Sequence, residues 1–579
     1  MEEFSDLPSR DVFGGTSQWI SGTFHHFNTY LYLYTALAGI SAHLLLFKYG
    51  EWHMQAPVLF RLYVIATLST TILAIVVHGY ETGTWRSLSL NITFMFSLFS
   101  SIGIYRVFFH RLKNFPGPIM ARTTKLWHVW KCITARSRNH HVLDNIHKQY
   151  GDFVRTGPSE ITIFHPEVFT AIDGPRTKCT KADWYDILLP ELAINTTRDK
   201  VEHDHRRKIW NTAFTSSDLV EYQHGVVAKL AGDLERIVER AARDGEVVRF
   251  SECLNWFSFD VMGEFAFAQS FHMLQNQQWH HAVTLIREAS KMLGIFNPAP
   301  WLTQIGFHIG GNWLHGVRDW NEGLGWCRIR MAERIETQDV MKKTDISSHL
   351  IEASRNAGMI TKQDRMWLNG DSITLVVAGS DTVSSTLTFL FHTLALHPHH
   401  QTTLFHELSN LHDCTNQSAL AKLPHLNGVI NEILRLHPAV PTGGNRLTPA
   451  EGITVAGTYI PGNTNIVAPR YTIARLESCF ENAGEFMPER WYEIGGGGRT
   501  KGFAPFGMGR YACVGKQLAL AELRLVTALL VSKYEFRIVD GKGGDDDGAD
   551  IVEGMRDQFT AQPGGELKLR FWLRGAEGE

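Results

Sequence analysis

The residues with the clearest chemical potential lie in a glycine-rich loop near the C-terminus. The segment Phe506–Val531 reads FGMGRYACVGKQLALAELRLVTALLV, with Cys513 followed by Gly515 and by an expected helix from about Lys516. Glycine lets the backbone approach a flat ligand closely, because it has no side chain to collide with it. The dipole and the free N–H groups of a helix N-terminus favour a thiolate. Cys513 is therefore a candidate sulfur ligand for iron, with a buried structural cysteine as the plainer alternative.

A second candidate lies in an expected helix through LVVAGSDTVSST, residues 375–386. Its apolar run is interrupted by Gly379 and then by Asp381 and Thr382, and a glycine inside a helix costs about 1 kcal/mol. One interpretation is a tolerated kink with capping-type residues. The other is functional, since a hydroxyl and a carboxylate beside a local helix distortion can relay protons.

Charged residues at helical spacing mark two further segments. In NEILRLHP, Glu432 and Arg435 lie three residues apart, so they share one helical face and can form an ion pair. An exposed pair of this kind contributes little to stability. Downstream, the segment PERW at Pro488–Trp491 supplies Arg490.

Three more residues are candidates for binding an anion. His203 and Arg207 lie four residues apart in VEHDHRRKIWNTAF, and Arg446 stands in PTGGNRLTP. The ordinary interpretation of basic residues on a helix is a solvated face, so spacing alone does not separate the two possibilities.

Taken in order, these segments resemble the cytochrome P450 family over about residues 115–575. The family's haem-binding signature, F-x-x-G-x-R-x-C-x-G, is matched by Phe506, Gly509, Cys513 and Gly515. The family's arginine falls at Tyr511, and the nearest arginine, Arg510, stands one position early. The resemblance implies a mainly α fold with small β-sheets, preceded here by N-terminal transmembrane helices.

The resemblance also implies roles for the candidate residues around haem b (iron protoporphyrin IX). Cys513 would be the axial ligand of the haem iron, in a loop shaped by Phe506 and Gly509. Gly379 would make room for dioxygen, Thr382 would hydrogen-bond it and Asp381 would relay protons. Haem propionates would be bound by His203, Arg207 and Arg446. The Glu432–Arg435 pair, completed by Arg490, would be a buried structural triad.

The activity implied is that of a monooxygenase, which inserts one atom of dioxygen into an organic substrate while the other leaves as water. Its electrons would come from NADPH through a separate flavoprotein reductase, because the chain carries no glycine-rich dinucleotide motif; Arg510 and Lys516 are candidates for docking it. The alternatives are a haem-thiolate isomerase or dehydratase, a non-catalytic membrane haemoprotein, and a membrane scaffold whose soluble domain has lost haem. Details of the sequence resemble fungal members of secondary metabolism.

Segments at the family's substrate-contact positions are mostly apolar and small. They are Ile194–Thr196, Phe296–Trp301, Leu375–Ala378, Ala439–Asn445 and the surroundings of Phe559. These segments bring no fixed charge into the expected pocket, so we expect a small, neutral, lipophilic substrate such as a terpenoid, polyketide or prenylated aromatic.

Apolar residues crowd into the first 110 positions. The runs 27–47, 56–77 and 87–109 are each about the length needed to cross a hydrocarbon core of ~30 Å, and they are apolar on every face. Arg106, Arg111 and Lys113 stand at the end of the third run, which places that end in the cytosol and favours a multi-pass protein of the endoplasmic reticulum. The sequence therefore predicts a lipid-embedded anchor over residues 1–114 and a cytosol-facing catalytic domain over residues 115–579, after the turn at Phe115–Pro118.

Composition and cysteine usage argue against a nucleic-acid-binding protein, a disulfide-rich protein and a zinc protein. The formal net charge is only −3, which gives no reason to expect a nucleic-acid partner. The seven cysteines are scattered without C-x-x-C pairs, so we expect free thiols rather than a disulfide framework or a zinc site. Helical periodicity marks residues 233–245, strand-like pieces occur near 153–155 and 567–572, and residues 541–548 are an expected Gly/Asp-rich loop.

Overall fold

The computed structural model describes residues 30–215, 217–338, 345–355, 359–492, 501–539 and 550–575. The chain divides into two compact units, residues 1–113 and 114–579. The expected loop at 541–548 and the first three residues of the expected span 27–47 lie outside the described residues.

The first unit is built from long apolar helices. They are a helix over Tyr30–Phe47 that ends in the π-helical turn η1 (His43–Phe47), α2 (Ala56–His78), and a helix over Tyr80–Phe109 made of α3 (Tyr80–Ile104) and the π-helical turn η2 (Tyr105–Phe109). All three are long and apolar enough to cross a membrane. The third begins at Tyr80 rather than at residue 87, because only Gly79, with φ of +80°, separates it from α2.

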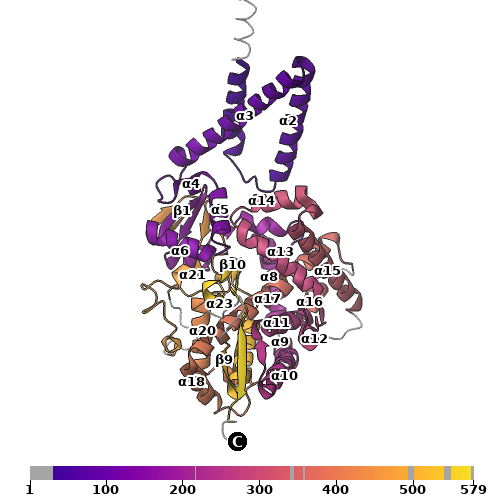
Figure 1. The fold of residues 1–579 in the computed structure, drawn as a ribbon, viewed down its shortest axis with the longest axis vertical. Coiled ribbons are helices and arrows are strands. Elements are labelled where there is room, and N and C mark those ends of the chain that lie inside the picture. The colour runs from indigo at the N-terminus through magenta and orange to yellow at the C-terminus, as the bar shows by residue number, and fades with distance from the viewer. Residues whose placement is uncertain are drawn as a thin grey trace, which may run out of the picture. The chain divides into compact units, whose positions relative to one another are not determined.

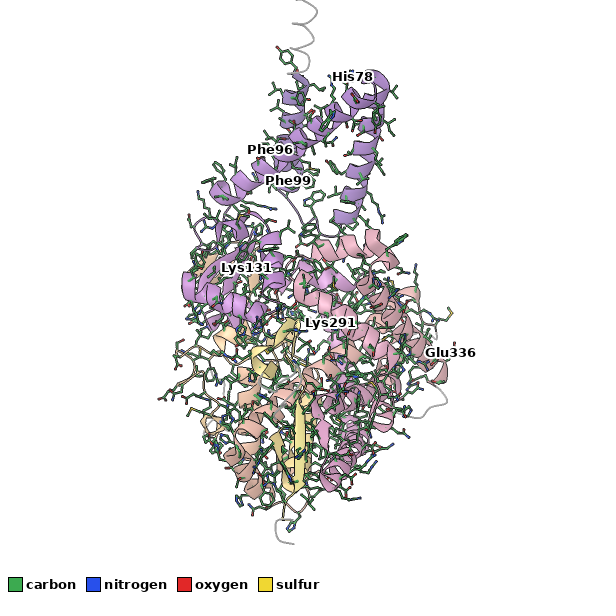
Figure 2. The ribbon with its side chains drawn as sticks, in the orientation of Figure 1. His78, Phe96, Phe99, Lys131, Lys291 and Glu336 are labelled. Atoms are coloured by element: carbon green, nitrogen blue, oxygen red, sulfur yellow. The ribbon has the colours of Figure 1, made fainter. Side chains whose placement is uncertain are left out.

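The helices of this first unit expose apolar side chains and bond to one another through polar ones. Figure 2 shows Phe96 and Phe99 projecting from α3, where 73% and 63% of their surfaces are exposed. Between the helices, Thr67 Oγ1 donates to Asn91 Oδ1 at 3.1 Å, and the hydroxyl oxygens of Thr71 and Ser87 lie 2.7 Å apart. Apolar outer faces with interhelical hydrogen bonds inside are typical of a transmembrane bundle.

A fourth helix, α17 (Lys362–Leu396), also has the length and hydropathy of a membrane span. In its most apolar window 78% of the residues are buried inside the fold, against 0–11% for the three N-terminal helices. A helix already covered by protein on all sides has no surface left for lipid. We therefore assign α17 to the core of the second unit and not to the membrane.

The second unit is mostly helical, which confirms the expected fold class (Figure 1). Besides α17, its helices and helical turns are α4 (Ile119–Thr123), α5 (Leu126–Thr134), α6 (Asn139–Tyr150), α7 (Glu167–Asp173), η3 (Asp183–Leu188), α8 (Lys200–Thr215), α9 (Ser217–Tyr222), η4 (Gln223–Val227), α10 (Ala228–Asp244), α11 (Phe250–Phe267), α12 (Met273–Asn276), α13 (His281–Phe296), α14 (Pro300–Ile305), η5 (Gly306–Gly310), η6 (Gly311–Trp313), α15 (His315–Thr337), α16 (Ile346–Ser354), α18 (Pro398–Leu408), α19 (Gln417–Leu420), α20 (Pro424–Leu436), α21 (Arg470–Ile473), η7 (Pro488–Trp491), η8 (Gly509–Tyr511), α22 (Lys516–Lys533) and α23 (Asp550–Glu553).

Small sheets complete this unit. Its strands are β1 (Phe153–Gly157), β2 (Glu160–Ile163), β3 (Thr180–Lys181), β4 (Val247–Arg249), β5 (Arg446–Leu447), β6 (Ile453–Val455), β7 (Thr458–Ile460), β8 (Asn465–Val467), β9 (Tyr534–Ile538), β10 (Arg556–Gln558), β11 (Thr560–Gln562) and β12 (Lys568–Leu573). The largest sheet has the order β1-β2-β8-β5-β3, a second has the order β4-β12-β9, and β6-β7 and β10-β11 are hairpins. The register of β3 with β5 places Lys181 directly opposite Arg446.

Helix α17 runs through the core and packs along α11. Its N-terminus is closed by a capping box, in which Thr361 and Asp364 each accept a hydrogen bond from the other's backbone N–H. The expected helix at 233–245 is α10, which ends on Gly245 in the left-handed conformation, and the expected strands are β1 and β12. In the Phe115–Pro118 break, Gly117 has φ of +148°, and an added Cβ there would collide with the Arg155 carbonyl oxygen.

A buried carboxylate ties α20 to the segment around η7. Glu432 and Arg435 have fully buried side chains, with Arg435 Nη2 2.7 Å from Glu432 Oε1 and Nε 2.9 Å from Oε2. Arg490 Nε donates to Glu432 Oε1 at 3.1 Å, and Trp491 Nε1 donates to Oε2 at 2.9 Å. Arg435 also donates to the carbonyl oxygens of Ala474 and Ala483. The expected triad is present, and Trp491 is a fourth member.

Because this network is buried, removing its carboxylate leaves two guanidinium groups without their counter-charge. We expect Glu432→Ala to lower the free energy of unfolding by about 3–5 kcal/mol, measured by urea unfolding followed by circular dichroism. The matched control is Glu239→Ala, which removes an exposed i,i+4 pair with Arg243 on α10 and should change it by less than about 1 kcal/mol. Equal effects of the two substitutions would contradict the role given to Glu432.

Candidate active site

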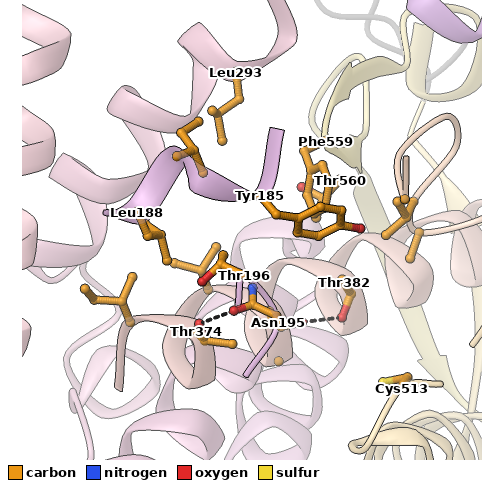
Figure 3. A pocket seen from close by; sticks show the side chains of 18 of the residues that line it. Tyr185, Leu188, Asn195, Thr196, Leu293, Thr374, Thr382, Cys513, Phe559 and Thr560 are labelled. Carbon is orange, nitrogen blue, oxygen red and sulfur yellow. Dashed lines mark hydrogen bonds between the residues drawn. The ribbon is translucent and has the colours of Figure 1, made fainter. Parts of the chain in front are cut away.

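The second unit contains a cavity of about 840 Å³ between α17 and the loop that carries Cys513. Such a volume lies in the range of sites that enclose a cofactor or drug-sized ligand. Figure 3 shows Thr382 on α17 and Cys513 on its loop, with Asn195, Leu293 and Phe559 around the same space. All five segments expected to contact substrate contribute to this lining, through Ile194, Phe296, Ala378, Val440 and Phe559 among others.

Cys513 has an accessible side chain although it lies in the interior, because its free surface faces this cavity. Its backbone N–H donates to the Phe506 carbonyl oxygen at 2.8 Å, which closes the loop. Burial raises the pKa of the Cys513 thiol, while the backbone amides of Gly515 and Lys516 and the charge of Arg207 act in the opposite direction. On balance the pKa is raised, so the sulfur favours the neutral thiol until a cation binds it, and these amides and Arg207 are the groups that would stabilise a thiolate ligand.

The glycines of this loop have conformational reasons to be there. Gly509 has φ of +61°, and an added Cβ would collide with the carbonyl oxygen of Asp173 at the end of α7. Gly507 has φ of +64°. L-residues with side chains rarely adopt this region, so the loop conformation depends on glycine. Phe506 also lines the cavity, as expected from the signature.

On the opposite wall, Thr382 Oγ1 donates to the Ala378 carbonyl oxygen at 2.7 Å, one turn earlier in α17. Asp381 is buried, and its Oδ1 has no hydrogen-bond partner among the described residues. Burial raises the pKa of Asp381 to about 6, against a smaller opposing effect of the Arg287 charge. Through this segment α17 is one uninterrupted α-helix, so the residues around Gly379 do not end it.

Gly379, which was expected to make room for dioxygen, also lies against a neighbouring helix. Its backbone lines the cavity, but an added Cβ would collide with the side chain of Met262 on α11. The missing side chain therefore lets α11 pack closely against α17. Room over the Cys513 loop is set by the position of the helix as a whole.

Cationic side chains gather at one part of the cavity wall. Arg446 is buried, with Nε 2.6 Å from Asp173 Oδ1 and Nη1 donating to Tyr185 Oη at 3.0 Å. Lys181 is buried and donates to the Ile194 carbonyl oxygen at 2.7 Å. Burial and the charges of Arg446 and Arg207 hold the pKa of Lys181 well below its usual value. At this part of the wall, Arg207 and Arg446 place two guanidinium groups near the Asp173 carboxylate.

His203 and Arg207 come to the same place from α8. His203 is buried, with its ring 4.9 Å from the ring of Tyr511. Arg207 Nη1 donates to the Ala512 carbonyl oxygen at 2.5 Å, so this helix contacts the residue just before Cys513. The structure thus places His203, Arg207 and Arg446 in the wall of one cavity. This is required if all three are to bind the haem propionates, as predicted.

The position of Tyr511 explains the departure from the family signature. Its ring lies under the guanidinium of Arg446 at 4.7 Å and under the amine of Lys181 at 5.1 Å. Its hydroxyl is buried and has no hydrogen-bond partner in the described part of the chain. Arg510 instead pairs with Asp204 on α8. Arg510 therefore does not replace the missing arginine, whereas Lys181 and Tyr511 supply a cation and a hydroxyl donor in this region.

The residues present fit haem. The orphaned Tyr511 hydroxyl and the two guanidinium groups suit a group with two carboxylates, and the inward-facing sulfur suits its iron. Sequence reasoning missed Lys181, because nothing in the surrounding TKAD distinguishes it from a surface lysine. It also missed the pair of Thr374 Oγ1 and Asn195 Oδ1, which lie 2.8 Å apart on the cavity wall.

Comparison with known proteins agrees with this geometry. The cytochrome P450 family model matches residues 120–552. The chain is 34% identical over 558 residues to cytochrome P450 monooxygenase FCK2 of Fusarium pseudograminearum, covering 93% of this chain and 96% of the relative. It is 34% identical to cytochrome P450 monooxygenase notG' of Aspergillus versicolor, over 92% and 96% of the two chains. It is 33% identical to tryprostatin B 6-hydroxylase of Aspergillus fumigatus, over 89% and 92%.

The chain therefore belongs to the cytochrome P450 family. It is a haem monooxygenase, an oxidoreductase that uses dioxygen.

The raised pKa of Asp381 predicts a pH dependence of stability. Between its usual value near 4 and about 6, the carboxyl ionises in the unfolded chain but stays neutral in the fold, so stability falls as pH rises through this window. Asp381→Asn does not titrate. Between pH 4 and 6, the thermal unfolding midpoint of this variant should rise relative to that of wild type. The difference in the free energy of unfolding should reach on the order of 2 kcal/mol and stay constant above pH 6. Parallel profiles of the two proteins would contradict the burial of an ionisable Asp381.

Proposed function

We propose that this monooxygenase is a membrane-bound enzyme of fungal secondary metabolism that inserts one oxygen atom of O2 into a neutral, lipophilic substrate. The observation that carries the proposal is the inward-facing Cys513 sulfur, which lies at a cavity whose remaining walls are mostly apolar. The names of the relatives support the metabolic setting, since one hydroxylates tryprostatin B.

Haem, when bound, would supply the activation of dioxygen, and the Cys513 sulfur would hold its iron. Around the sulfur, the chain holds a fixed loop: Gly509 permits its turn, the Phe506 carbonyl accepts the Cys513 N–H, and Arg207 binds the Ala512 carbonyl. The amides at the start of α22 orient towards negative charge, which favours the thiolate.

Thr382 delivers protons to the cavity from α17, and Asp381, which is buried next to it in the helix and does not line the cavity, resupplies them. The Thr382 hydroxyl, now bonded to the Ala378 carbonyl, faces the cavity and can turn its proton towards dioxygen. Asp381, whose pKa lies near 6, is able to release and regain a proton near neutral pH. The apolar surroundings exclude bulk water from the reacting atoms.

The haem propionates would be bound by His203, Arg207 and Arg446, together with Lys181 and the Tyr511 hydroxyl. All five line the cavity. Two carboxylates would accept charge-assisted hydrogen bonds from the guanidinium groups.

The substrate occupies the part of the cavity away from these cations. Its walls include Leu188, Leu293, Phe296 and Val377, and Phe559 is held there by stacking on Trp184 at 4.3 Å. Among these apolar groups, Asn195 leaves its amide N–H groups towards the cavity because its Oδ1 accepts from Thr374. A lipophilic molecule with one hydrogen-bond acceptor fits this lining.

The enzyme works at the endoplasmic reticulum, with the catalytic unit in the cytosol, where a NADPH-dependent flavoprotein reductase supplies electrons. The basic Arg106, Arg111 and Lys113 at the end of the third span support this orientation. Lys516, exposed beside the Cys513 loop, is a docking cation for an acidic reductase surface. Arg510 is the weaker candidate because it pairs with Asp204.

The ligand assignment is tested by the carbon monoxide difference spectrum of the reduced protein in microsomes. Wild type should show the strongly red-shifted Soret band of thiolate-ligated haem, and Cys513→Ala should lose it. The matched control is Cys414→Ala, a half-buried cysteine that does not line the cavity, and it should keep the band. Retention of the band in Cys513→Ala would overturn the assignment.

Thr382→Val keeps the shape of the side chain and removes its hydroxyl. With reductase and a substrate identified by screening, we expect product formation to fall on the order of 10²-fold while NADPH oxidation continues, because proton delivery fails after electrons have arrived. Thr388→Val removes the same kind of helix-carbonyl bond without lining the cavity and should leave product yield unchanged. Equal product yield in the two variants would remove Thr382 from the mechanism.

Lys181→Met tests the propionate assignment by a readout other than activity. Loss of one charge-assisted bond should raise the rate of haem loss to apomyoglobin about tenfold. Lys178→Met, an exposed lysine two residues before β3 that pairs with Glu451, should not change it. An unchanged haem-loss rate in Lys181→Met would exclude this lysine from the set.

A further inference from the structure

Away from the cavity, α18, α20 and η7 bring three potential metal ligands together. His400 lies near the start of α18, His425 near the start of α20, and Glu489 in η7. Both histidine side chains are buried, whereas the Glu489 carboxylate is half exposed. None of the three lines the cavity that contains Cys513, so their arrangement has no part in the site described above.

Their ligand atoms have nearly the spacing of a tetrahedral metal site. His400 Nδ1 lies 3.3 Å from His425 Nε2 and 3.7 Å from Glu489 Oε1, and all three atoms lie within 4.8 Å of one another. Ligands bound at 2.0–2.1 Å in tetrahedral geometry are about 3.4 Å apart. The two buried imidazoles already satisfy this distance. The half-exposed Glu489 carboxylate, 3.7 Å from His400 Nδ1, would have to move closer to complete it.

The ring of His425 is oriented by a partner on its far side. His425 Nδ1 lies 2.6 Å from Tyr492 Oη, and the His425 backbone N–H donates to Glu407 Oε1 at 2.8 Å. A partner on the far ring nitrogen fixes the ring, as is usual for metal-bound histidine. With Nδ1 engaged by Tyr492, Nε2 is the nitrogen that points at His400.

The imidazoles of His400 and His425 are in the neutral form, which can bind a cation. Burial, with the neighbouring His399, His425 and His397 rings, lowers the pKa of His400 to about 3, and burial also lowers the pKa of His425. Both imidazoles are neutral at pH 7 and keep their lone pairs. The single negative charge of Glu489 partly compensates a divalent ion.

We propose that His400, His425 and Glu489 bind one divalent transition-metal ion of the zinc class, with water in the fourth position. Two imidazoles and a carboxylate are ligands that Zn²⁺ accepts in this geometry. The ion would join α18 and α20 to the segment 486–492. That segment also supplies Met487 N, Arg490 and Trp491 to the Glu432 carboxylate, so the metal would stabilise the structural network on which the Cys513 loop rests.

The test uses the full-length holoenzyme, stripped of metal with a chelator and titrated with Zn²⁺ in a calorimeter. Wild type should bind one Zn²⁺ per chain, and its thermal unfolding midpoint should rise with Zn²⁺ concentration. His425→Ala and Glu489→Gln should each weaken binding at least 100-fold. Tyr492→Phe should weaken it about tenfold, as for loss of a partner behind a metal-bound histidine.

His399→Ala is the matched control, because this neighbouring histidine is exposed and lies outside the ligand set. It should bind Zn²⁺ like wild type. Glu489→Gln changes an exposed side chain and keeps the fold testable where His425→Ala does not fold, and the carbon monoxide spectrum verifies intact haem binding in each variant. The proposal would be overturned if wild type bound Zn²⁺ no more tightly than Glu489→Gln, or if His399→Ala lost as much affinity for Zn²⁺ as the ligand variants. His400 and His425 would then be a hydrogen-bonded pair.

Discussion

The buried carboxylate of Glu432 holds together the part of the catalytic unit that supports the Cys513 loop. It is fully buried, and a buried charge is tolerated only when it is paired and hydrogen-bonded. Arg435, Arg490 and Trp491 satisfy it from two segments of the chain. Trp491 then packs on Phe503 at 4.5 Å, three residues before the loop that begins with Phe506. The position of the Cys513 sulfur depends on this chain of contacts.

The cavity above that sulfur has two chemically different parts. Lys181, Arg207 and Arg446 give one part a positive charge that suits the carboxylates of haem, while the rest of the lining is mostly apolar. Helix α17 separates this space from the core behind it and presents Thr382 to it. An apolar pocket and a bundle of membrane-spanning helices in the same chain are consistent with a substrate that partitions into lipid.

Much of the site was predictable because the family signature is local. Cys513, Phe506 and Gly509 lie within one short loop, and the Glu432–Arg435 pair follows from helical spacing alone. Lys181 was not predictable, since it reaches Arg446 only through the pairing of β3 with β5. The contact of Gly379 with Met262 was not predictable, because Met262 comes from another helix. Position alone did not reveal that Arg510 pairs with Asp204 instead of facing the cavity.

The sequence by itself indicated the apolar N-terminal helices, the mainly helical class and the candidate sulfur ligand, because hydropathy, periodicity and a glycine-rich loop are properties of neighbouring residues. The tertiary structure alone decided which cations share the cavity, which tyrosine hydroxyl remains unpaired there, and that α17 belongs to the core although its hydropathy equals that of a membrane span. These depend on contacts between residues far apart in the chain. Packing, rather than local composition, sets the charge, solvation and partners of each such side chain.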